Sequence, residues 1–549
     1  MKINITTILI LTSLSSCLMK EETDIIIHNA TIYTVDNTFS KAAAMAVKDG
    51  KIVAIGAERE ILNKYKAKEV IDAGTRPVYP GFIDAHCHFL GYGLSLQQVD
   101  LVGTKSFDEV IEKVVGFSKN NNSAWITGRG WDQNDWEVKE FPNKKKLDNL
   151  FPNTPVFLKR IDGHAALVNS EALNRAGITV ETKTDGGIVE VKNGELTGIL
   201  IDNAIDLVSK VIPTPSKEHI TKALQNAEKD CFAVGLTTAD DAGLDKEVVD
   251  LIDSLHRNGL LKMRIYAMIN PARENLNYYS ENGQLKTNRL NVRSFKFYAD
   301  GALGSRGACL IEPYSDEPGH YGLLLNDAGY LKQMAQKVFD MGFQINTHCI
   351  GDSANRLMLD IYGEILKGTN DKRWRIEHAQ VIHPSDFEKF ARYNIIPSVQ
   401  PTHATSDMYW AEDRLGSERV KGAYSYKQLL EQNGMIALGT DFPVEDIKPL
   451  NTFYAAVSRK DSRGFPKSGY QIENALTREE ALRGMTIWAA IANFEENEKG
   501  SLEVGKFADF VILNRDILQI PLGEIQNIKV VSTFVNGEDV YSVTPTNYK

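Results

Sequence analysis

Five apolar, strand-like runs in this chain each lead into residues that can bind a metal or carry a proton. The runs are PVYPGFIDAHCH, VRSFKFYADG, GFQINTHCIGD, RWRIEHAQ and MIALGTDFP. The residues that share this position are, in chain order, His86, His88, Lys296, His348, His378 and Asp441. A closed parallel barrel brings the C-terminal ends of its strands to one face. The pattern therefore favours a fold that gathers these six side chains in one place.

The middle of the chain alternates strand-like and helix-like segments, which predicts an α/β fold with a parallel sheet covered by helices. Eight candidate strands are present, the number that closes a (β/α)8 TIM barrel. They span residues 79–85, 235–239, 263–269, 292–298, 343–347, 373–377, 395–399 and 435–440. We expect helices at 330–341, 353–366 and 385–393, with Ser385 as an N-cap. Thr477 and Glu480 have the spacing of a capping box for a further helix.

Both ends of the chain contain short strand-like runs with hairpin signals, Asp49-Gly50 near the start and Asn536-Gly537 near the end. We expect residues 24–78 and 500–549 to form one β-sandwich, and residues 79–499 to form the barrel. Roughly 150 residues separate the first two barrel strands, which is too long for a loop. Residues 92–232 are therefore predicted to be an insert. It leaves from the C-terminal end of a barrel strand, so we expect a lid over the site.

The N-terminus has the features of a secretory signal, with Lys2, a short apolar core and small residues before Cys17. The sequence Leu-Ser-Ser-Cys resembles a bacterial lipobox, which implies a signal peptide of residues 1–16 and lipidation of Cys17. The alternative is an ordinary soluble signal with an incidental cysteine. Residues 17–23 are then expected to be a tether. We predict a lipoprotein of the bacterial cell envelope, periplasmic or surface-exposed, that meets the membrane only through its lipid.

Composition excludes some partners and leaves others open. The formal net charge of −10 argues against nucleic-acid binding, which requires a basic surface. The cysteines after Cys17 lack the spacing of a disulfide framework, so we expect free, buried thiols, although one bridge is not excluded. These cysteines are Cys87, Cys231, Cys309 and Cys349. A homodimer is one of several oligomeric states that the sequence leaves open.

The six strand-end residues suit a site for two divalent cations. His86 and His88 are two residues apart on one strand, so both face the same side. Imidazole is a good ligand for zinc, and Asp441 adds a carboxylate oxygen. His348 and His378 end neighbouring strands and offer ligands for a second ion. Zinc is favoured, while iron, manganese and cobalt fit the same ligands.

Lys296 is the least usual member of this set. It alternates with Phe295 and Phe297, so we expect it to face the barrel interior. A buried ammonium beside two cations is unfavourable unless it is neutralised or modified. Reaction with carbon dioxide gives a carbamate, which reverses the charge and supplies two oxygens to bridge the metals. The alternative is a lysine paired with Asp300 or another acid.

Two cations that flank one water lower its pKa from ~16 towards 7 and supply hydroxide at neutral pH. They also polarise a substrate carbonyl. Asp441 is the expected proton carrier: it takes the proton from the attacking hydroxide and delivers it to the leaving nitrogen.

The motifs YPGFIDAHCH, FYADGALGSRGA, INTHCIGD, IEHAQ and GTDFPV resemble the amidohydrolase superfamily. More narrowly, they are similar to its long-insert branch, amidohydrolase family 3, which includes N-substituted formamide deformylases. The resemblance covers about residues 24–541. It implies a (β/α)8 barrel with a β-sandwich, a carbamate on Lys296 and hydrolysis of an amide, N-formyl or N-acyl bond of a small molecule. It does not identify the substrate, because the superfamily hydrolyses many compounds on one scaffold.

Further side chains are expected to meet the substrate. Asp162-Gly163-His164 resembles a motif of this branch that reaches the metal site, and His164 is expected to orient the substrate or stabilise an oxyanion. His403 follows the seventh strand, at the barrel mouth. The remaining candidates are Trp131, Asp132, Asp300, Ser305 and Arg306. Glu377 is expected to point away from His378 and to support the site without binding metal.

Two other functions remain open. A barrel of this superfamily that has lost catalysis would serve as a binding protein, but such proteins typically show an eroded ligand set, and this set is intact. The same metal site would also suit an ester, lactone or phosphoester, because the same hydroxide attacks all of these bonds.

Overall fold

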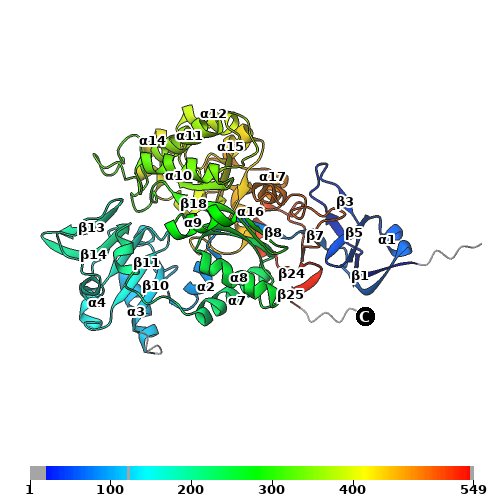
Figure 1. The fold of residues 1–549 in the computed structure, drawn as a ribbon, viewed down its shortest axis with the longest axis horizontal. Coiled ribbons are helices and arrows are strands. Elements are labelled where there is room, and N and C mark those ends of the chain that lie inside the picture. Colours follow the sequence, from blue (N-terminus) through cyan, green and yellow to red (C-terminus); the bar gives the residue numbers. More distant parts are fainter. Residues whose placement is uncertain (1–19, 120–123, 544–549) are drawn as a thin grey trace, which may run out of the picture.

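A computed structural model describes residues 20–119 and 124–543. Its centre is a barrel of eight parallel strands (Figure 1). The strands are, in spatial order, β8 (Phe82–Cys87), β15 (Leu236–Leu244), β16 (Arg264–Ile269), β18 (Leu290–Tyr298), β19 (Gln344–Cys349), β20 (Arg375–His378), β21 (Ile396–Val399) and β22 (Ala437–Leu438). Each overlaps one predicted strand, and the predicted α/β fold with a TIM barrel is confirmed.

The barrel closes between its last and first strands through backbone contacts. The Asp441 N–H donates to the His86 carbonyl at 2.8 Å, and the His88 N–H donates to the Phe442 carbonyl at 2.9 Å. Gly439 permits this close approach, because a Cβ atom there would lie 2.5 Å from the His86 backbone nitrogen. The seam therefore holds two histidines and an aspartate side by side.

Helices cover the barrel because alternate side chains of its strands are apolar and point outward. The Phe295 ring points outward, and its centroid lies 5.2 Å from that of Phe343. Lys296, the next residue on the same strand, is fully buried in the barrel interior. The outer layer includes α8 (Lys246–Arg257), α9 (Arg273–Asn282), α10 (Ala328–Asp340) and α11 (Asp352–Leu366). Two of these, α10 and α11, are the helices predicted at 330–341 and 353–366.

Two other helix predictions differ in outcome. The capping box of Thr477 and Glu480 is present at the start of α17 (Arg478–Gly484). Ser385, in contrast, is not an N-cap: a 3-10 turn (Pro384–Asp386) precedes α12 (Phe387–Arg392), and the His383 side chain accepts a bond from the Ser385 N–H. The proline in the turn allows the imidazole to take the capping position.

Strands from both chain ends form the two sheets beside the barrel. One sheet holds β1 (Glu21–His28), β4 (Ala44–Lys48), β5 (Lys51–Gly56) and β6 (Tyr65–Asp72). The other joins β2 (Thr31–Tyr33), β3 (Lys41–Ala42) and β7 (Pro77–Pro80) to β23 (Phe510–Leu513), β24 (Val530–Val535) and β25 (Glu538–Ser542). The antiparallel pairing of β7 with β23 is where the two chain ends meet.

The hairpins and the start of β1 follow from local sequence. Asp49 and Gly50 have φ values of 51° and 76°, and Asn536 and Gly537 have 52° and 71°, as tight two-residue turns require. The first strand begins at Glu21 and pairs in register with β6. Residues 21–23, which we expected to belong to the tether, are therefore part of β1, where they pair with residues of β6.

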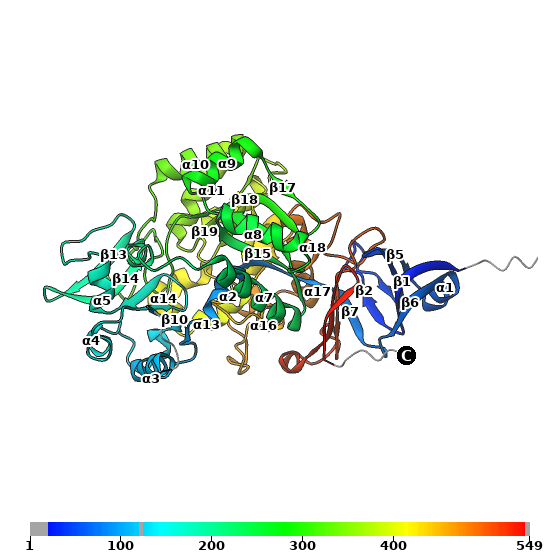
Figure 2. The same cartoon turned by 60° about the horizontal axis from the view of Figure 1, so that its bottom comes forward.

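The insert contains a sheet of its own, placed on the far side of the barrel from the two terminal sheets (Figures 1 and 2). Its strands are β9 (Val99–Asp100), β10 (Ile126–Trp131), β11 (Val156–Arg160), β12 (Ala165–Val168), β13 (Gly187–Lys192) and β14 (Glu195–Asp202). One face packs on α3 (Phe107–Ser118), the other on α5 (Ser170–Arg175) and α6 (Ile205–Ser209). Helix α7 (Lys217–Ala233), inside the expected insert range, packs against β15 and α2 (Phe89–Ser95) as part of the barrel layer.

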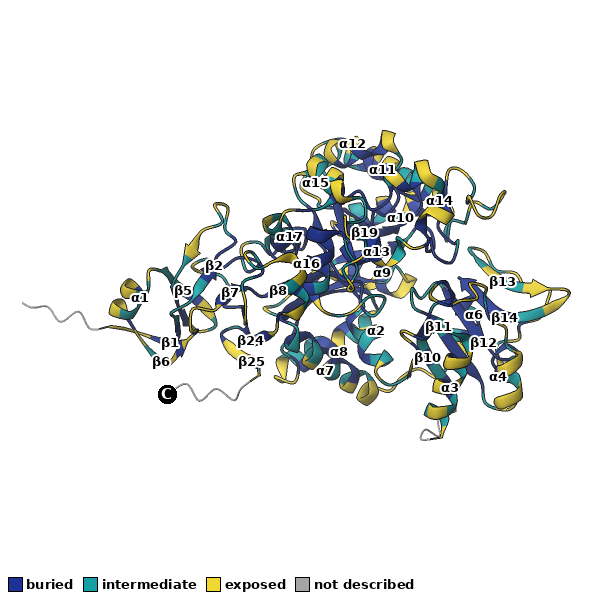
Figure 3. Cartoon of the chain, turned by 180° about the vertical axis from the view of Figure 1, so that it is seen from behind, coloured by how far each residue is buried: buried dark blue, intermediate teal, exposed yellow. Residues whose placement is uncertain are grey.

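Buried residues concentrate in the barrel strands and in the insert sheet, and exposed residues lie on the outer helices (Figure 3). Cys87, Cys231 and Cys349 are buried free thiols, as expected, and Cys309 is a free, partly buried one. The expected signal peptide and Cys17 lie outside the described residues. Within residues 20–119 and 124–543, no helix has both the length and the apolar character needed to cross a bilayer.

Candidate metal centre

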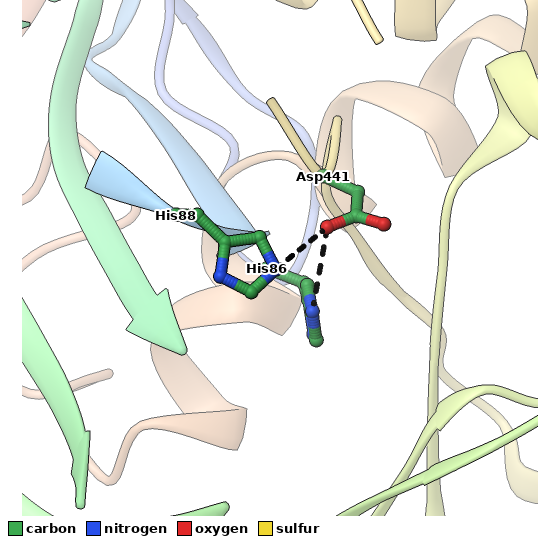
Figure 4. Close-up of side chains that lie close together, drawn as sticks. All are labelled: His86, His88 and Asp441. Carbon is green, nitrogen blue, oxygen red and sulfur yellow. Dashed lines mark ion pairs between the residues drawn. The ribbon is translucent and has the colours of Figure 1, made fainter. Parts of the chain in front are cut away.

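His86, His88 and Asp441 form one group of potential metal ligands (Figure 4). Asp441 Oδ1 lies 3.2 Å from His88 Nε2 and 3.7 Å from His86 Nε2. His88 precedes α2, and its Nδ1 donates to the Ala242 carbonyl at 3.1 Å. This bond places the ring proton on Nδ1 and leaves Nε2 free to bind a cation.

A buried carboxylate orients His86. Its Nδ1 lies 2.5 Å from Glu377 Oε2, and Glu377 Oε1 lies 2.7 Å from Arg375 Nε, with all three side chains fully buried. Burial and the charge of Lys296 lower the pKa of His86 to about 4 despite Glu377. The imidazole is therefore neutral, with its Nε2 lone pair directed at the site. Glu377 has the supporting position expected for it.

A second group consists of His378, His403 and Asp441. His403 comes from α13 (Pro401–Asp407), and its Nε2 lies 3.6 Å from Asp441 Oδ2. His378 Nδ1 donates to Gln400 Oε1 at 2.8 Å, which directs its other nitrogen toward the site. The structure places His403 among the potential metal ligands, and its contact with the substrate stays a prediction.

His348 and Lys296 lie beside these two groups. The His348 ring is 4.5 Å from the His378 ring. The Lys296 ammonium lies 4.2 Å from the Tyr298 ring centroid, and within the described residues it has neither a hydrogen bond nor an ion pair. Burial, then the neighbouring histidines and Lys296, lower the pKa values of His348 and His378. The structure thus gathers all six predicted residues, and Lys296 does not pair with Asp300.

The buried polar atoms of this neighbourhood fit a cation. Within the described residues, the atoms without a hydrogen-bond partner include His86 Nε2, Lys296 Nζ, His403 Nε2 and Asp441 Oδ1. Each unpaired buried polar atom costs about 1–3 kcal/mol. Imidazole nitrogens and a carboxylate oxygen are ligands that divalent metals such as zinc prefer. A bound metal would satisfy the two imidazole nitrogens and the carboxylate oxygen, whereas the Lys296 ammonium would have to be neutralised or modified beside it, so the histidines and the aspartate fit a metal centre.

Backbone conformation explains why neighbouring residues both face the site. His378, Ala379 and Asp441 have φ values of 71°, 43° and 62°. Such values are uncommon for residues other than glycine and cost about 1–3 kcal/mol each. Because of the positive φ at His378 and Ala379, the side chains of His378 and Glu377 both point into the barrel. Simple strand alternation would have placed them on opposite faces.

The insert reaches the site through His164. The His164 ring is 5.1 Å from that of His348, and its Nδ1 lies 2.7 Å from Asp202 Oδ1. Burial disfavours protonation of His164, but Asp202 outweighs it and raises the pKa. The Asp202 carboxylate fits against Gly301 and Gly307, where a Cβ atom would lie 2.6 and 2.5 Å from it. Asp202 was missed because an aspartate ending an apolar strand carries no distinctive motif.

Two insert residues predicted to bind substrate have structural roles. Trp131 is fully buried in the insert core, and its indole N–H donates to the Leu158 carbonyl at 2.8 Å. The prediction of an aromatic wall at Trp131 is therefore wrong, because this side chain fills the core under the sheet. Asp132 forms an ion pair with Arg160.

The glycine-rich loop after β18 is also held by internal contacts. Asp300 is fully buried and accepts backbone N–H bonds from three residues, Cys309, Ile350 and Gly351. Ser305 donates to the Ala302 carbonyl, and Arg306 pairs with Asp316 at 3.0 Å. These contacts hold the loop in place beside His348, and contact of Asp300 and Arg306 with substrate stays a prediction.

Comparison with known proteins agrees with this geometry. The sequence profile of the amidohydrolase family matches residues 69–541. The chain is 34% identical to the Bacillus subtilis protein YtcJ, over 94% of this chain and 98% of that protein. It is 26% identical to the N-substituted formamide deformylase of Arthrobacter pascens, over 94% and 98% of the two chains.

Among solved structures, an uncharacterized metal-dependent hydrolase from Pyrococcus horikoshii superposes with a TM-score of 0.76 and 30% identity. The match covers 91% of this chain and 99% of that one. The resemblance drawn from the strand-end motifs is confirmed, and this chain belongs to the amidohydrolase family.

Proposed function

We propose that this enzyme hydrolyses a carbon–nitrogen bond of a small amide, N-formyl or N-acyl compound, using two divalent cations, with zinc as the preferred metal. The observation that carries the proposal is the set of four unpaired buried atoms on His86, Lys296, His403 and Asp441. A relative named as an N-substituted formamide deformylase supports the class of bond.

Two sets of residues would hold the cations. His86, His88 and Asp441 suit one ion, and His348 and His378 suit the other, with His403 adjacent. We propose that Lys296 would carry a carbamate and supply oxygen ligands to the metal centre, because the modification turns a buried positive charge without an ion-pair partner in the described residues into a negative one. When bound, the cations supply Lewis-acid chemistry: they lower the pKa of a water molecule and polarise the substrate carbonyl.

Asp441 is the proposed proton carrier. Burial would raise its pKa, but the neighbouring imidazoles of His88, His86 and His378 hold it well below the ordinary value. The ionised carboxylate can accept the proton lost by the attacking water and pass it to the leaving nitrogen. His164, positioned by Asp202, can donate a hydrogen bond to the substrate oxygen as negative charge develops there.

Chelation tests this proposal. Removing metal from the purified protein should abolish hydrolysis of an N-formyl or N-acyl substrate, and zinc with bicarbonate should restore it. Elemental analysis of the active protein should give two metal ions per chain. Esters and lactones in the same panel determine whether the C–N bond is preferred. An unchanged rate in metal-free protein would overturn the proposed mechanism.

We also propose that the protein is anchored to the cell envelope through lipidated Cys17. The Leu-Ser-Ser-Cys sequence that ends at this residue supports the assignment. Cys17→Ser should move the protein from the membrane fraction to the soluble fraction of the producing cells. Equal membrane retention of both forms would contradict a lipid anchor at this position.

A further inference from the structure

Two positively charged side chains stand side by side on the insert sheet without a carboxylate partner. Arg129 on β10 and Lys159 on the parallel strand β11 are paired in register. Lys159 alternates with Leu158, which packs in the insert core on the opposite face of the sheet. Neither cation forms an ion pair within residues 20–119 and 124–543, although Arg160, next in the chain, forms two. Like charges directly across neighbouring strands are destabilising, so this arrangement needs a compensating partner.

The nearby carboxylates are already engaged. Arg160 binds both Asp132 and Asp162, and Asp202 bonds to His164. The charge of Asp206 raises the pKa of Lys159, but the two residues form no ion pair within the described part of the chain. In the described part of the chain, therefore, neither cation has a carboxylate partner of its own.

The hydrogen bonds of Arg129 are also incomplete. Its Nη2 donates to the Ile161 carbonyl at 2.8 Å, while its buried Nε has no hydrogen-bond partner among the residues that the structure describes. A guanidinium pairs most strongly when two of its N–H groups meet two oxygens of one anion. Burial and then the charge of Arg129 lower the pKa of Lys159 to about 8. An anion placed between these groups would relieve both unfavourable effects.

Arg129 lies on the side of the insert that meets the metal centre, and Lys159 lies beside it on the neighbouring strand. A Cβ atom on Gly163 would sit 3.6 Å from both Nη atoms of Arg129. The next residue is His164, whose ring lies 5.1 Å from that of His348. Asp441 is close enough for its charge to act on Arg129, where it opposes the effect of burial on the pKa. A substrate at the metal centre can therefore extend toward the two cations.

We propose that Arg129 and Lys159 bind an anionic group of the substrate, a carboxylate or a phosphate, while the amide lies at the metal centre. The inference rests on the proposed hydrolysis and narrows it to amides that also carry an acid. Arg129 supplies the planar, two-point contact, and Lys159 supplies a second charge.

Matched substrates provide the first test. We compare kcat/KM for 3-formamidopropanoate with that for its uncharged amide, 3-formamidopropanamide, and add 2-formamidoethyl phosphate to separate carboxylate from phosphate. The wild type should prefer an anionic substrate. Arg129→Gln and Lys159→Gln should each reduce that preference by about 10–100-fold, the range expected for loss of one charge-assisted bond. Arg129→Lys should fall between wild type and Arg129→Gln.

Two features keep this test specific. Arg129→Gln also removes the bond to Ile161, whereas the Lys159 amine makes no hydrogen bond within the described part of the chain, so Lys159→Gln is the cleaner variant. Lys192→Gln, on β13 at the outer edge of the insert, removes an equal charge from a lysine that pairs with Glu190 and is 63% exposed. The preference should be unaltered in this control.

A binding measurement separates failure of this inference from failure of the proposed function. Butanoate, butanamide and inorganic phosphate are titrated calorimetrically into metal-loaded wild type and the Arg129→Gln/Lys159→Gln double variant. If no amide is cleaved but an anion binds the double variant at least about tenfold more weakly than it binds the wild type, the anion site is supported and the proposed hydrolysis is refuted. If amides are cleaved without regard to charge, and anions bind both proteins equally, the anion site is refuted.

Discussion

Replacing Glu377 with glutamine tests whether a second layer of residues controls the metal centre. Both oxygens of this carboxylate meet a partner: one forms a hydrogen bond with His86 Nδ1 at 2.5 Å, and the other forms an ion pair with Arg375 Nε at 2.7 Å. An amide offers only one accepting oxygen, so it can satisfy one donor and must present its NH₂ to the other. If the NH₂ faces His86, the ring proton moves to Nε2, the nitrogen that would otherwise bind the cation.

The magnitude follows from the bond that is lost. A hydrogen bond to a charged group contributes about 1.5–3 kcal/mol to stability. Loss of an outer partner of a ligating histidine typically weakens metal binding by about 10–100-fold. Glu377→Gln should therefore raise the Kd for zinc by ~10–100-fold and lower the free energy of unfolding of the metal-free protein by ~1.5–3 kcal/mol.

Chelator competition measures the zinc Kd, and urea unfolding measures stability. Glu495→Gln is a matched control, because this buried glutamate pairs with Lys286 and Lys499 instead of a potential ligand. The control should lose stability but keep its zinc affinity. The reasoning is refuted if Glu377→Gln binds zinc within twofold of wild type, or if the control loses affinity equally.

Three further predictions follow from the same contacts. Lys296→Met should leave metal-free protein as stable as wild type or more stable, because it removes a fully buried amine that has no hydrogen-bond partner in the described residues. It should also reduce the amount of bound metal found by elemental analysis, and full metal retention would contradict the role assigned to Lys296. Gly439→Ala should lower the free energy of unfolding by about 1–3 kcal/mol or more, since its Cβ would meet the His86 backbone nitrogen at 2.5 Å; an unchanged melting temperature would argue against a tight seam. In metal-free protein, the raised pKa of His164 gives stability that is fully present below about pH 6.5 and is lost as pH rises past the folded pKa. The stability difference between wild type and Asp202→Asn should therefore shrink from pH 6 to pH 9, and a constant difference would count against the coupling.

The sequence predicted the barrel because its strands are short apolar runs that end in polar, chemically capable residues. The same regularity located His86, His88, Lys296, His348, His378 and Asp441, since a strand end is a fixed place in a barrel. These are the parts of the molecule where local pattern and position in the fold coincide.

Other parts depend on contacts that a linear pattern does not contain. Trp131 follows a glycine-rich run, which suits a core residue and a pocket wall equally well, and only packing shows that it belongs to the core. The inward turn of His378 comes from its φ of 71°, which departs from strand alternation. Asp202 acquires its role from Gly301 and Gly307, about a hundred residues away in sequence.

The meeting of β7 with β23 has a consequence for how the chain acquires its structure. Val78 pairs with Ile512, so the edge of β7 stays without its partner until nearly the whole polypeptide has been synthesised. An unpaired edge is prone to associate with other chains in that interval. Because β8, which carries His86, begins at Phe82 immediately after β7, a stop codon before Phe510 would deprive the metal-binding strand of its support without altering a single ligand.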